Sequence, residues 1–151
     1  MRKLLLMVLL MGFCTNCDDS FVSSIPDVTF RLECDMRQAA YSVVRTPGQF
    51  VSVDKNNHGY RVGYAGLLVG QSAFTGMNNE AVYYALDRAC PVEVSTEVAV
   101  TLKPGTAQAV CPRCGTVYDL NNGGVPSGQG TEFLKRYTVT CQGDILVVSS
   151  R

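Results

Sequence analysis

Short stretches of alternating apolar and polar residues run through most of the chain. Such alternation predicts half-buried β-strands, which we expect at residues 28–32, 49–54, 60–69, 98–102, 107–110, 117–120, 136–141 and 144–148. Turn-forming residues separate these stretches, and Gln142-Gly143 is a strong signal for a tight hairpin. About nine or ten short strands at regular spacing predict one all-β domain of antiparallel sheets, arranged as a sandwich or barrel.

Two segments carry conflicting patterns. Residues 35–44 combine apolar residues at helical spacing with strand-forming residues near their end. Residues 80–89 follow a candidate helix cap, although Val82-Tyr83-Tyr84 favours a strand. The pattern alone leaves both segments open between helix and strand.

Three further segments depart from simple alternation. Phe50 and Val53 point to unlike faces of their expected strand, which predicts a β-bulge between them. Residues 71–79 have no clear apolar period and are expected to form a loop. Residues 121–130, rich in Gly, Asn and Pro, are expected to form a second loop.

The first 17 residues have the pattern of a bacterial lipoprotein signal peptide. Arg2 and Lys3 precede an apolar run over residues 4–13, which suits a signal-peptide core and is too short to span a bilayer. Cys17, where the polar residues begin, is the favoured site of lipidation, and Cys14 is the second choice. An ordinary secretory leader is the alternative interpretation.

Either kind of leader takes the protein out of the cytoplasm. Residues 18–25 are expected to form a tether and residues 26–151 the β domain. Asp18-Asp19 after a lipidated cysteine resembles the acidic export tether of Bacteroidetes surface lipoproteins. The expected location is therefore the cell envelope, with the lipid in the outer membrane and the domain facing outward. The membrane would be a partner only through this N-terminal lipid.

The composition is typical of one packed domain. The chain has 151 residues, of which 46% are hydrophobic and 17% are charged. Basic and acidic residues number 13 each, and because Arg2 and Lys3 belong to the leader, the remainder carries a net charge of −2. Without a basic run or patch, no nucleic-acid partner is expected.

Cysteines are the most informative residues of the chain, which has seven of them. Cys111 and Cys114 form a C-x-x-C pair between two expected strands, and Gly115 follows where a tight loop needs a residue without a side chain. Cys90 lies upstream, before Pro91. A C-x-x-C loop between strands can hold a metal ion, an iron–sulfur cluster or a short disulfide.

Three stretches resemble the Rieske-type 2Fe-2S domain family. They are Gly66-Leu67-Leu68-Val69, Tyr84-Ala85-Leu86-Asp87-Arg88-Ala89-Cys90-Pro91-Val92-Glu93 and Cys111-Pro112-Arg113-Cys114-Gly115-Thr116-Val117-Tyr118-Asp119-Leu120. Residues 124–148 resemble the closing part of that fold. The resemblance implies three small antiparallel sheets with a cluster at the tips of two loops, and it favours a strand at residues 80–89.

The ligand set departs from that of the family. A Rieske cluster takes Cys-x-His from the first loop and Cys-x-x-His from the second, so that thiolates bind one iron and imidazoles the other. The resemblance assigns the thiolate positions to Cys90 and Cys111, and it places Val92 and Cys114 at the histidine positions. Because valine offers no lone pair, the outer iron lacks a ligand, which a water, Glu93 or another chain could replace.

Two hypotheses follow from this departure. The favoured one is a degenerate Rieske-like lipoprotein without a cofactor, in a non-catalytic binding or structural role, with its tip closed by a Cys90–Cys111 or a Cys111–Cys114 disulfide. The alternative is a zinc ion or a 2Fe-2S cluster held by Cys90, Cys111 and Cys114, the cluster serving electron transfer. The sequence names no redox partner or surface ligand.

A cysteine-dependent enzyme is the weakest hypothesis, because it needs a base beside the thiol. The only histidine, His58, falls in an expected hairpin turn and is interpreted as a solvated residue, so no catalytic residue is assigned. Arg88 and Arg113 would lower a thiol pKa if they lie close to one. Cys34 and Cys141 are expected to be small core residues, with a disulfide between them as the alternative.

Overall fold

Ten strands and one short 3-10 helix form the part of the chain that the structure, a computed structural model, describes, namely residues 23–150. All strand pairs are antiparallel, which confirms the expected all-β class. The elements in chain order are β1 (Arg31–Asp35), η1 (Ser42–Arg45), β2 (Phe50–Val53), β3 (Leu67–Thr75), β4 (Ala81–Asp87), β5 (Thr101–Leu102), β6 (Gln108–Val110), β7 (Val117–Asp119), β8 (Val125–Ser127), β9 (Arg136–Gln142) and β10 (Ile145–Ser149).

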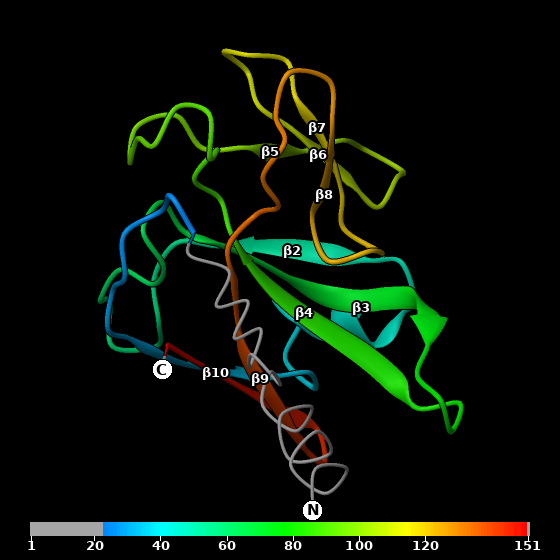
Figure 1. Ribbon diagram of the computed structural model, residues 1–151. Helices are drawn as coiled ribbons and strands as arrows, with labels where there is room; N and C mark the ends of the chain where they lie inside the picture. The colour runs from blue at the N-terminus through cyan, green and yellow to red at the C-terminus, as the bar shows by residue number, and fades with distance from the viewer. Residues whose placement is uncertain (1–22, 151) are drawn as a thin grey trace, which may run out of the picture.

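The described strands form two hydrogen-bonded sheets. Six strands follow the order β1-β10-β9-β4-β3-β2, and four follow the order β5-β6-β7-β8. Figure 1 shows the small sheet at the top, above β2, β3 and β4, with β9 and β10 below. The first residues of β9 pair with β4 and the rest of β9 pairs with β10, so the large sheet bends where β9 changes partner. Three sheets were expected, and β9 joins two of them into one.

Strands β2 to β4 have a hydrophobic core on each face. In β3, Leu67 and Val69 pack into one core, and Leu68, which points the other way, packs into the second. Phe50 and Val53 of β2 are divided between the two cores in the same manner. The ladder between β2 and β3 is regular at these residues, so the expected β-bulge is wrong. Both faces of these strands are apolar because each face packs against other parts of the protein.

Strand pairing decides the segments that the sequence left open or assigned to loops. Residues 81–87 form strand β4, as the resemblance favoured, and residues 35–44 form turns and the start of η1. The loop expected at residues 71–79 is wrong in its first half, because β3 continues to Thr75 against β4. The loop expected at 121–130 contains β8, which completes the small sheet. Each of these strands depends on pairing with another strand, which the apolar pattern of the segment itself does not reveal.

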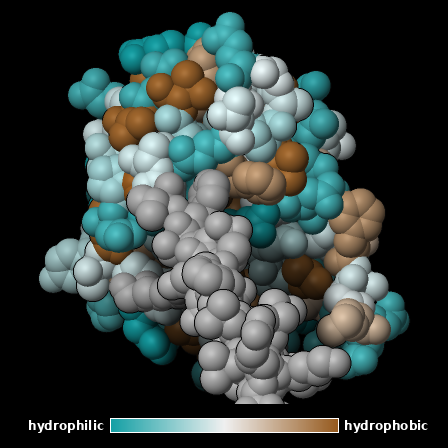
Figure 2. All heavy atoms as spheres, in the orientation of Figure 1, coloured by the Kyte–Doolittle hydropathy of each residue, from teal (hydrophilic) through white to brown (hydrophobic). Residues whose placement is uncertain are grey.

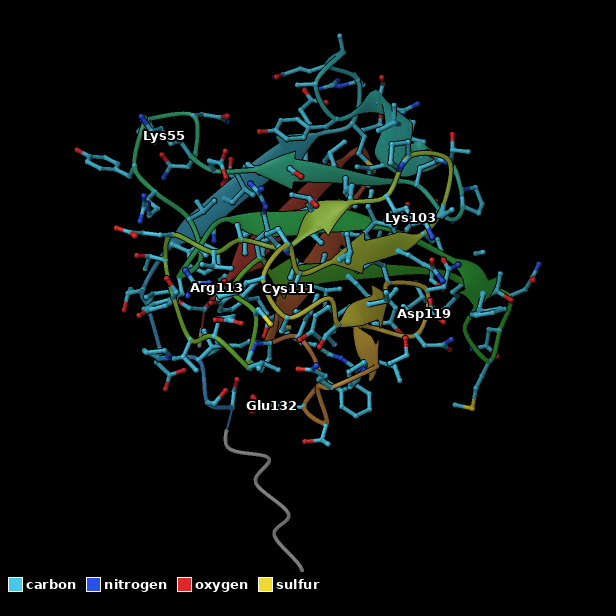
Figure 3. The ribbon with its side chains drawn as sticks, turned by 90° about the horizontal axis from the view of Figure 1, so that it is seen from above. Lys55, Lys103, Cys111, Arg113, Asp119 and Glu132 are labelled. Atoms are coloured by element: carbon cyan, nitrogen blue, oxygen red, sulfur yellow. The ribbon has the colours of Figure 1, made fainter. Side chains whose placement is uncertain are left out.

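The N-terminal segment of the described chain is fastened to the domain. The Glu132 carboxylate accepts hydrogen bonds from Ser23 Oγ at 3.0 Å and from the Ser24 N–H at 2.8 Å. Ser24 Oγ donates to the Pro91 carbonyl at 3.3 Å, and Ile25 is buried although it was assigned to the tether. Figure 3 shows Glu132 beside the start of the described chain.

The leader lies outside the described residues. This applies to the signal peptide expected over residues 1–17, to Cys14 and Cys17, and to residues 18–22 of the tether. Between residues 23 and 150, the chain forms no helix that is long and apolar enough to cross a membrane.

Candidate metal centre

Two loops bring three cysteines together at one end of the small sheet. Cys90 lies in the loop between β4 and β5, and Cys111 and Cys114 lie in the loop between β6 and β7. Figure 3 shows Cys111 and Arg113 toward one end of this sheet and Lys103 and Asp119 toward the other. The strands β6 and β7 therefore set the position of the second loop against the first.

The three sulfur atoms are close enough to bind one ion. The Sγ atoms of Cys90, Cys111 and Cys114 all lie within 4.8 Å of one another, and those of Cys90 and Cys114 are 3.6 Å apart. Tetrahedral zinc–sulfur bonds of about 2.3 Å place two sulfur ligands about 3.8 Å apart. Cys90 and Cys111 are buried, whereas Cys114 is partly exposed. All three are free thiols in this structure.

Backbone hydrogen bonds fold each loop around its first cysteine. In the second loop, the Gly115 N–H donates to the Cys111 carbonyl at 3.0 Å, and Gly115 has the positive φ of 72° that glycine adopts readily. In the first loop, the N–H groups of Glu93 and Val94 both donate to the Cys90 carbonyl. Val94 has a φ of 47°, which is costly for a β-branched residue.

Two hydroxyl groups contact the sulfur atoms. The Tyr118 hydroxyl lies 3.3 Å from Cys90 Sγ, and the Cys114 thiol donates to Thr116 Oγ1 at 3.2 Å. Thr116 is itself buried and is held by the Gly130 N–H, which donates to Oγ1 at 3.1 Å. Hydroxyl groups can turn their protons toward a thiolate, so both are suited to stabilise negative charge on sulfur.

The thiols differ in acidity because their surroundings differ. Burial raises the pKa of Cys90 to about 11, against the opposing effect of the bond with Tyr118. Burial also acts to raise the pKa of Cys114, but hydrogen bonds from Thr116 and from the neighbouring thiols together hold that pKa below its usual value. Burial and the bond to Cys90 raise the pKa of Tyr118, so Tyr118 remains a hydroxyl donor. Cys114, which is partly exposed, thus ionises more readily than the buried Cys90.

Charged residues near the loops are paired with each other. Arg113 binds Glu93 at 3.1 Å and so joins the two loops at the surface. Glu93, a candidate for the missing ligand, is engaged in this ion pair. Arg88 binds Asp54 at 2.7 Å and the Val100 carbonyl. Both arginines are thus bound to carboxylates of the protein.

Two other residues that the sequence singled out, His58 and Val92, are exposed. His58 is exposed in its turn, where its N–H donates to Asn56 Oδ1, as the interpretation of a solvated residue requires. Val92, at the position where the resemblance expects the first histidine, is 47% exposed. Figure 2 shows brown apolar residues over the upper part of the molecule, set among polar ones.

A 2Fe-2S cluster does not fit the donors that the described residues provide. A binuclear cluster needs four ligands, divided between two irons that stand apart. The loops provide three sulfur atoms, and these lie within the span of a single ion. Val92 adds a hydrocarbon in place of the fourth donor. The donor set therefore matches one ion better than two.

Cys34 and Cys141 do not form a disulfide. Both are in register with Leu146 of β10, one from each side, so two strand spacings of about 4.8 Å separate them, beyond the reach of a disulfide. Cys34 is fully buried as expected, and burial raises its pKa to about 12. Cys141 shares its face but lies at the end of β9, beside the hairpin turn, and is exposed, so the expected core position is wrong.

Sequence reasoning missed the residues that support the loops. The hydroxyl contact of Tyr118 with Cys90 was not foreseen. Asp87 is fully buried and accepts hydrogen bonds from the N–H groups of Ala65 and Ala89 and from the Tyr137 hydroxyl. A lone carboxylate at the end of an apolar strand, three residues before Cys90, is the signal that could have revealed it.

No protein-family model matches the chain, and neither the curated proteins nor the solved structures include a significant match.

Proposed function

We propose that this protein is a non-catalytic, lipid-anchored envelope protein whose Rieske-like domain binds one metal ion of the zinc class through Cys90, Cys111 and Cys114. The observation that carries the proposal is the approach of three free thiols to within 4.8 Å of one another. They come from two separate loops, so a single ion would join parts of the chain that are distant in sequence. Thiolates select zinc and other soft metals over magnesium or calcium.

The surroundings of the thiols suit metal binding better than catalysis. Hydroxyl groups of Thr116 and Tyr118 lie at hydrogen-bonding distance from two of the three sulfur atoms and can support them as ligands. The candidate bases lie elsewhere: His58 is in an exposed turn, and Glu93 is paired with Arg113. Within residues 23–150, neither His58 nor Glu93 is therefore placed as a free base for a metal-bound water. The fourth position would belong to water or to a donor from a partner.

The envelope location in this proposal is supported by the leader pattern. A short apolar run after Arg2 and Lys3, closed by Cys17, is typical of a lipoprotein signal peptide. The Rieske-like architecture is supported by the two cysteine loops and by the all-β fold that carries them. In this proposal the metal stabilises the tip, where a cluster would have served electron transfer.

Metal analysis of the full chain tests the proposal. The protein would be purified anaerobically, loaded with zinc or cobalt, and assayed for zinc, iron and visible absorbance. We expect one zinc per chain, and cobalt absorbance typical of thiolate ligands, both lost in Cys111→Ser. The matched control is Cys141→Ser, which removes an exposed thiol outside the cluster and should leave binding unchanged.

Two outcomes would contradict the zinc proposal. Failure of the reduced protein to take up zinc or cobalt would leave a tip without a cofactor. Two irons per chain with strong visible absorbance would instead indicate a 2Fe-2S cluster with an unusual ligand set.

A further inference from the structure

We propose that Cys114 and Cys90 are a thiol–disulfide exchange pair, in which Cys114 attacks an external disulfide and Cys90 resolves the product. The proposed substrates are disulfides of small thiols and exposed disulfides of proteins. The inference extends the proposed function, because the same thiols would bind the metal in the reduced form. In the metal site all three thiols are ligands, whereas in the exchange Cys114 and Cys90 have different roles.

Accessibility selects Cys114 as the attacking residue. Cys90 is 0% exposed and Cys111 is 1% exposed, whereas Cys114 is partly open to solvent. The neighbouring Gly115 faces open space, since a Cβ atom added there would meet nothing within 4 Å. An external disulfide can therefore reach one of the three sulfur atoms, and it can do so without displacing a side chain at Gly115.

Distance selects Cys90 as the resolving residue. Its Sγ lies 3.6 Å from Cys114 Sγ, on the buried side of that thiol. The Tyr118 hydroxyl lies 3.3 Å from Cys90 Sγ and can donate to the thiolate during the second step. The pairing differs from both disulfides that the sequence suggested, Cys90–Cys111 and Cys111–Cys114. The C-x-x-C spacing alone favours the latter, because it cannot show that Cys90 lies beside Cys114.

The exchange balances in two steps. The Cys114 thiolate attacks one sulfur of an external disulfide, forms a mixed disulfide and releases one thiolate, which takes up a proton. That proton comes from the Cys90 thiol, whose thiolate then attacks Cys114 Sγ, forms the Cys90–Cys114 disulfide and releases the second thiolate, which takes up a proton from water. Two protein thiols are oxidised and one disulfide is reduced to two thiols. Any metal ion loses two of its three sulfur ligands and is released.

Oxidised glutathione is the probe for the test. The full chain carrying Cys14→Ser, Cys17→Ser and Cys141→Ser, so that the leader thiols and the exposed Cys141 do not react, would be incubated anaerobically with the probe in metal-free and zinc-loaded forms. Products would be mapped by mass spectrometry after cleavage by trypsin and by a protease specific for glutamate. Cleavage after Arg88, Glu93, Glu97, Arg113 and Glu132 places Cys90, Cys111 and Cys114 on three different peptides.

We expect a Cys90–Cys114 disulfide, two molecules of reduced glutathione per chain, and loss of bound zinc to a chromophoric chelator. In Cys90→Ala the internal disulfide should be lost and glutathione should remain on Cys114. In Cys34→Ser, which removes a buried thiol outside the cluster, the exchange should continue. Circular dichroism would verify that both variants retain β structure. If one variant does not fold, the identity of the disulfide mapped in the parent chain tests the exchange pair by itself.

Other results separate the two proposals. A Cys111–Cys114 or Cys90–Cys111 disulfide, or glutathione that stays on Cys114 of the parent chain, would overturn the exchange pair while leaving the metal site standing. Exchange by a chain that takes up no zinc would overturn the metal site alone. Zinc binding with no reaction toward the probe in the metal-free form would also refute the exchange pair.

Discussion

A single buried carboxylate, Asp87, connects the fold to the thiol loops. It accepts N–H donors from Ala65 on one side and from Ala89, directly before Cys90, on the other, and it also accepts the Tyr137 hydroxyl at 2.7 Å. Burial, and then the charge of Asp87, raise the pKa of Tyr137, so the hydroxyl keeps its proton and remains a donor. Asp87 thereby fixes the start of the first loop.

Replacing Asp87 by Asn should destabilise the protein strongly. The amide keeps the volume but turns two N–H donors toward a site built from donors, and we expect the free energy of unfolding to fall by about 2–3 kcal/mol, measured by urea denaturation. Asp54→Asn is the control: Asp54 is exposed and pairs with Arg88, so its loss should change the free energy of unfolding by less than about 1 kcal/mol. If the two variants lost equal free energy of unfolding, the hydrogen bonds of Asp87 would contribute no more to stability than a surface ion pair does.

At the scale of elements, the close pairing of β2 with β3 depends on a glycine within β3. Gly70 of β3 pairs with Phe50 of β2, and a Cβ atom at Gly70 would lie 2.3 Å from the Gln49 carbonyl oxygen and 2.4 Å from the Phe50 ring. The φ angle of Gly70 is not positive, so this glycine serves close packing and not a turn. The aromatic ring of Phe50 covers the strand at this point.

The substitution Gly70→Ala should therefore push the two strands apart. We expect a loss of about 1–3 kcal/mol in the free energy of unfolding, since neither backbone nor ring can yield freely. In Gly76→Ala the new Cβ meets its nearest neighbour at 3.7 Å, and stability should stay within about 0.5 kcal/mol. Thermal denaturation of the two variants side by side would decide, and a milder effect at Gly70 would argue against the close approach.

Alternation of apolar residues predicted most of the strands because half-buried strands dominate the outer parts of the sheets. It failed where both faces are covered, as at Phe50 and Val53, and where a short strand without an apolar period is defined by its pairing, as β8 is by β7. The three candidate ligands were found from cysteine spacing and a family resemblance, and the structure brings them together. The contact between Cys90 and Cys114 could not be predicted, because it depends on how the two loops meet.

The whole molecule is organised around strands shared by two cores. Leu67 and Leu68 are neighbours in β3, yet one belongs to the core shared with β1 and β10 and the other to the core beneath the small sheet. Each core uses the opposite face of the same ladder. Neither core can therefore open without exposing the strands on which the other rests.

This arrangement predicts one cooperative unfolding transition. Leu67→Ala and Leu68→Ala should each lower the free energy of unfolding by about 2–5 kcal/mol, because both side chains are fully buried. Circular dichroism and tyrosine fluorescence should give coincident denaturation curves in both variants. A separate early transition in Leu68→Ala alone would mean that the small sheet unfolds independently, and the two sheets would then be two units.

The bond from Ser24 Oγ to the Pro91 carbonyl fixes where the described chain leaves the domain, close to Cys90. If Cys17 carries lipid as proposed, the six backbone steps from Cys17 to Ser23 reach at most about 22 Å. The first thiol loop would then remain near the lipid headgroups and could not swing out into solution. Its reaction partners would be molecules that diffuse along the membrane surface or are small enough to enter this narrow layer.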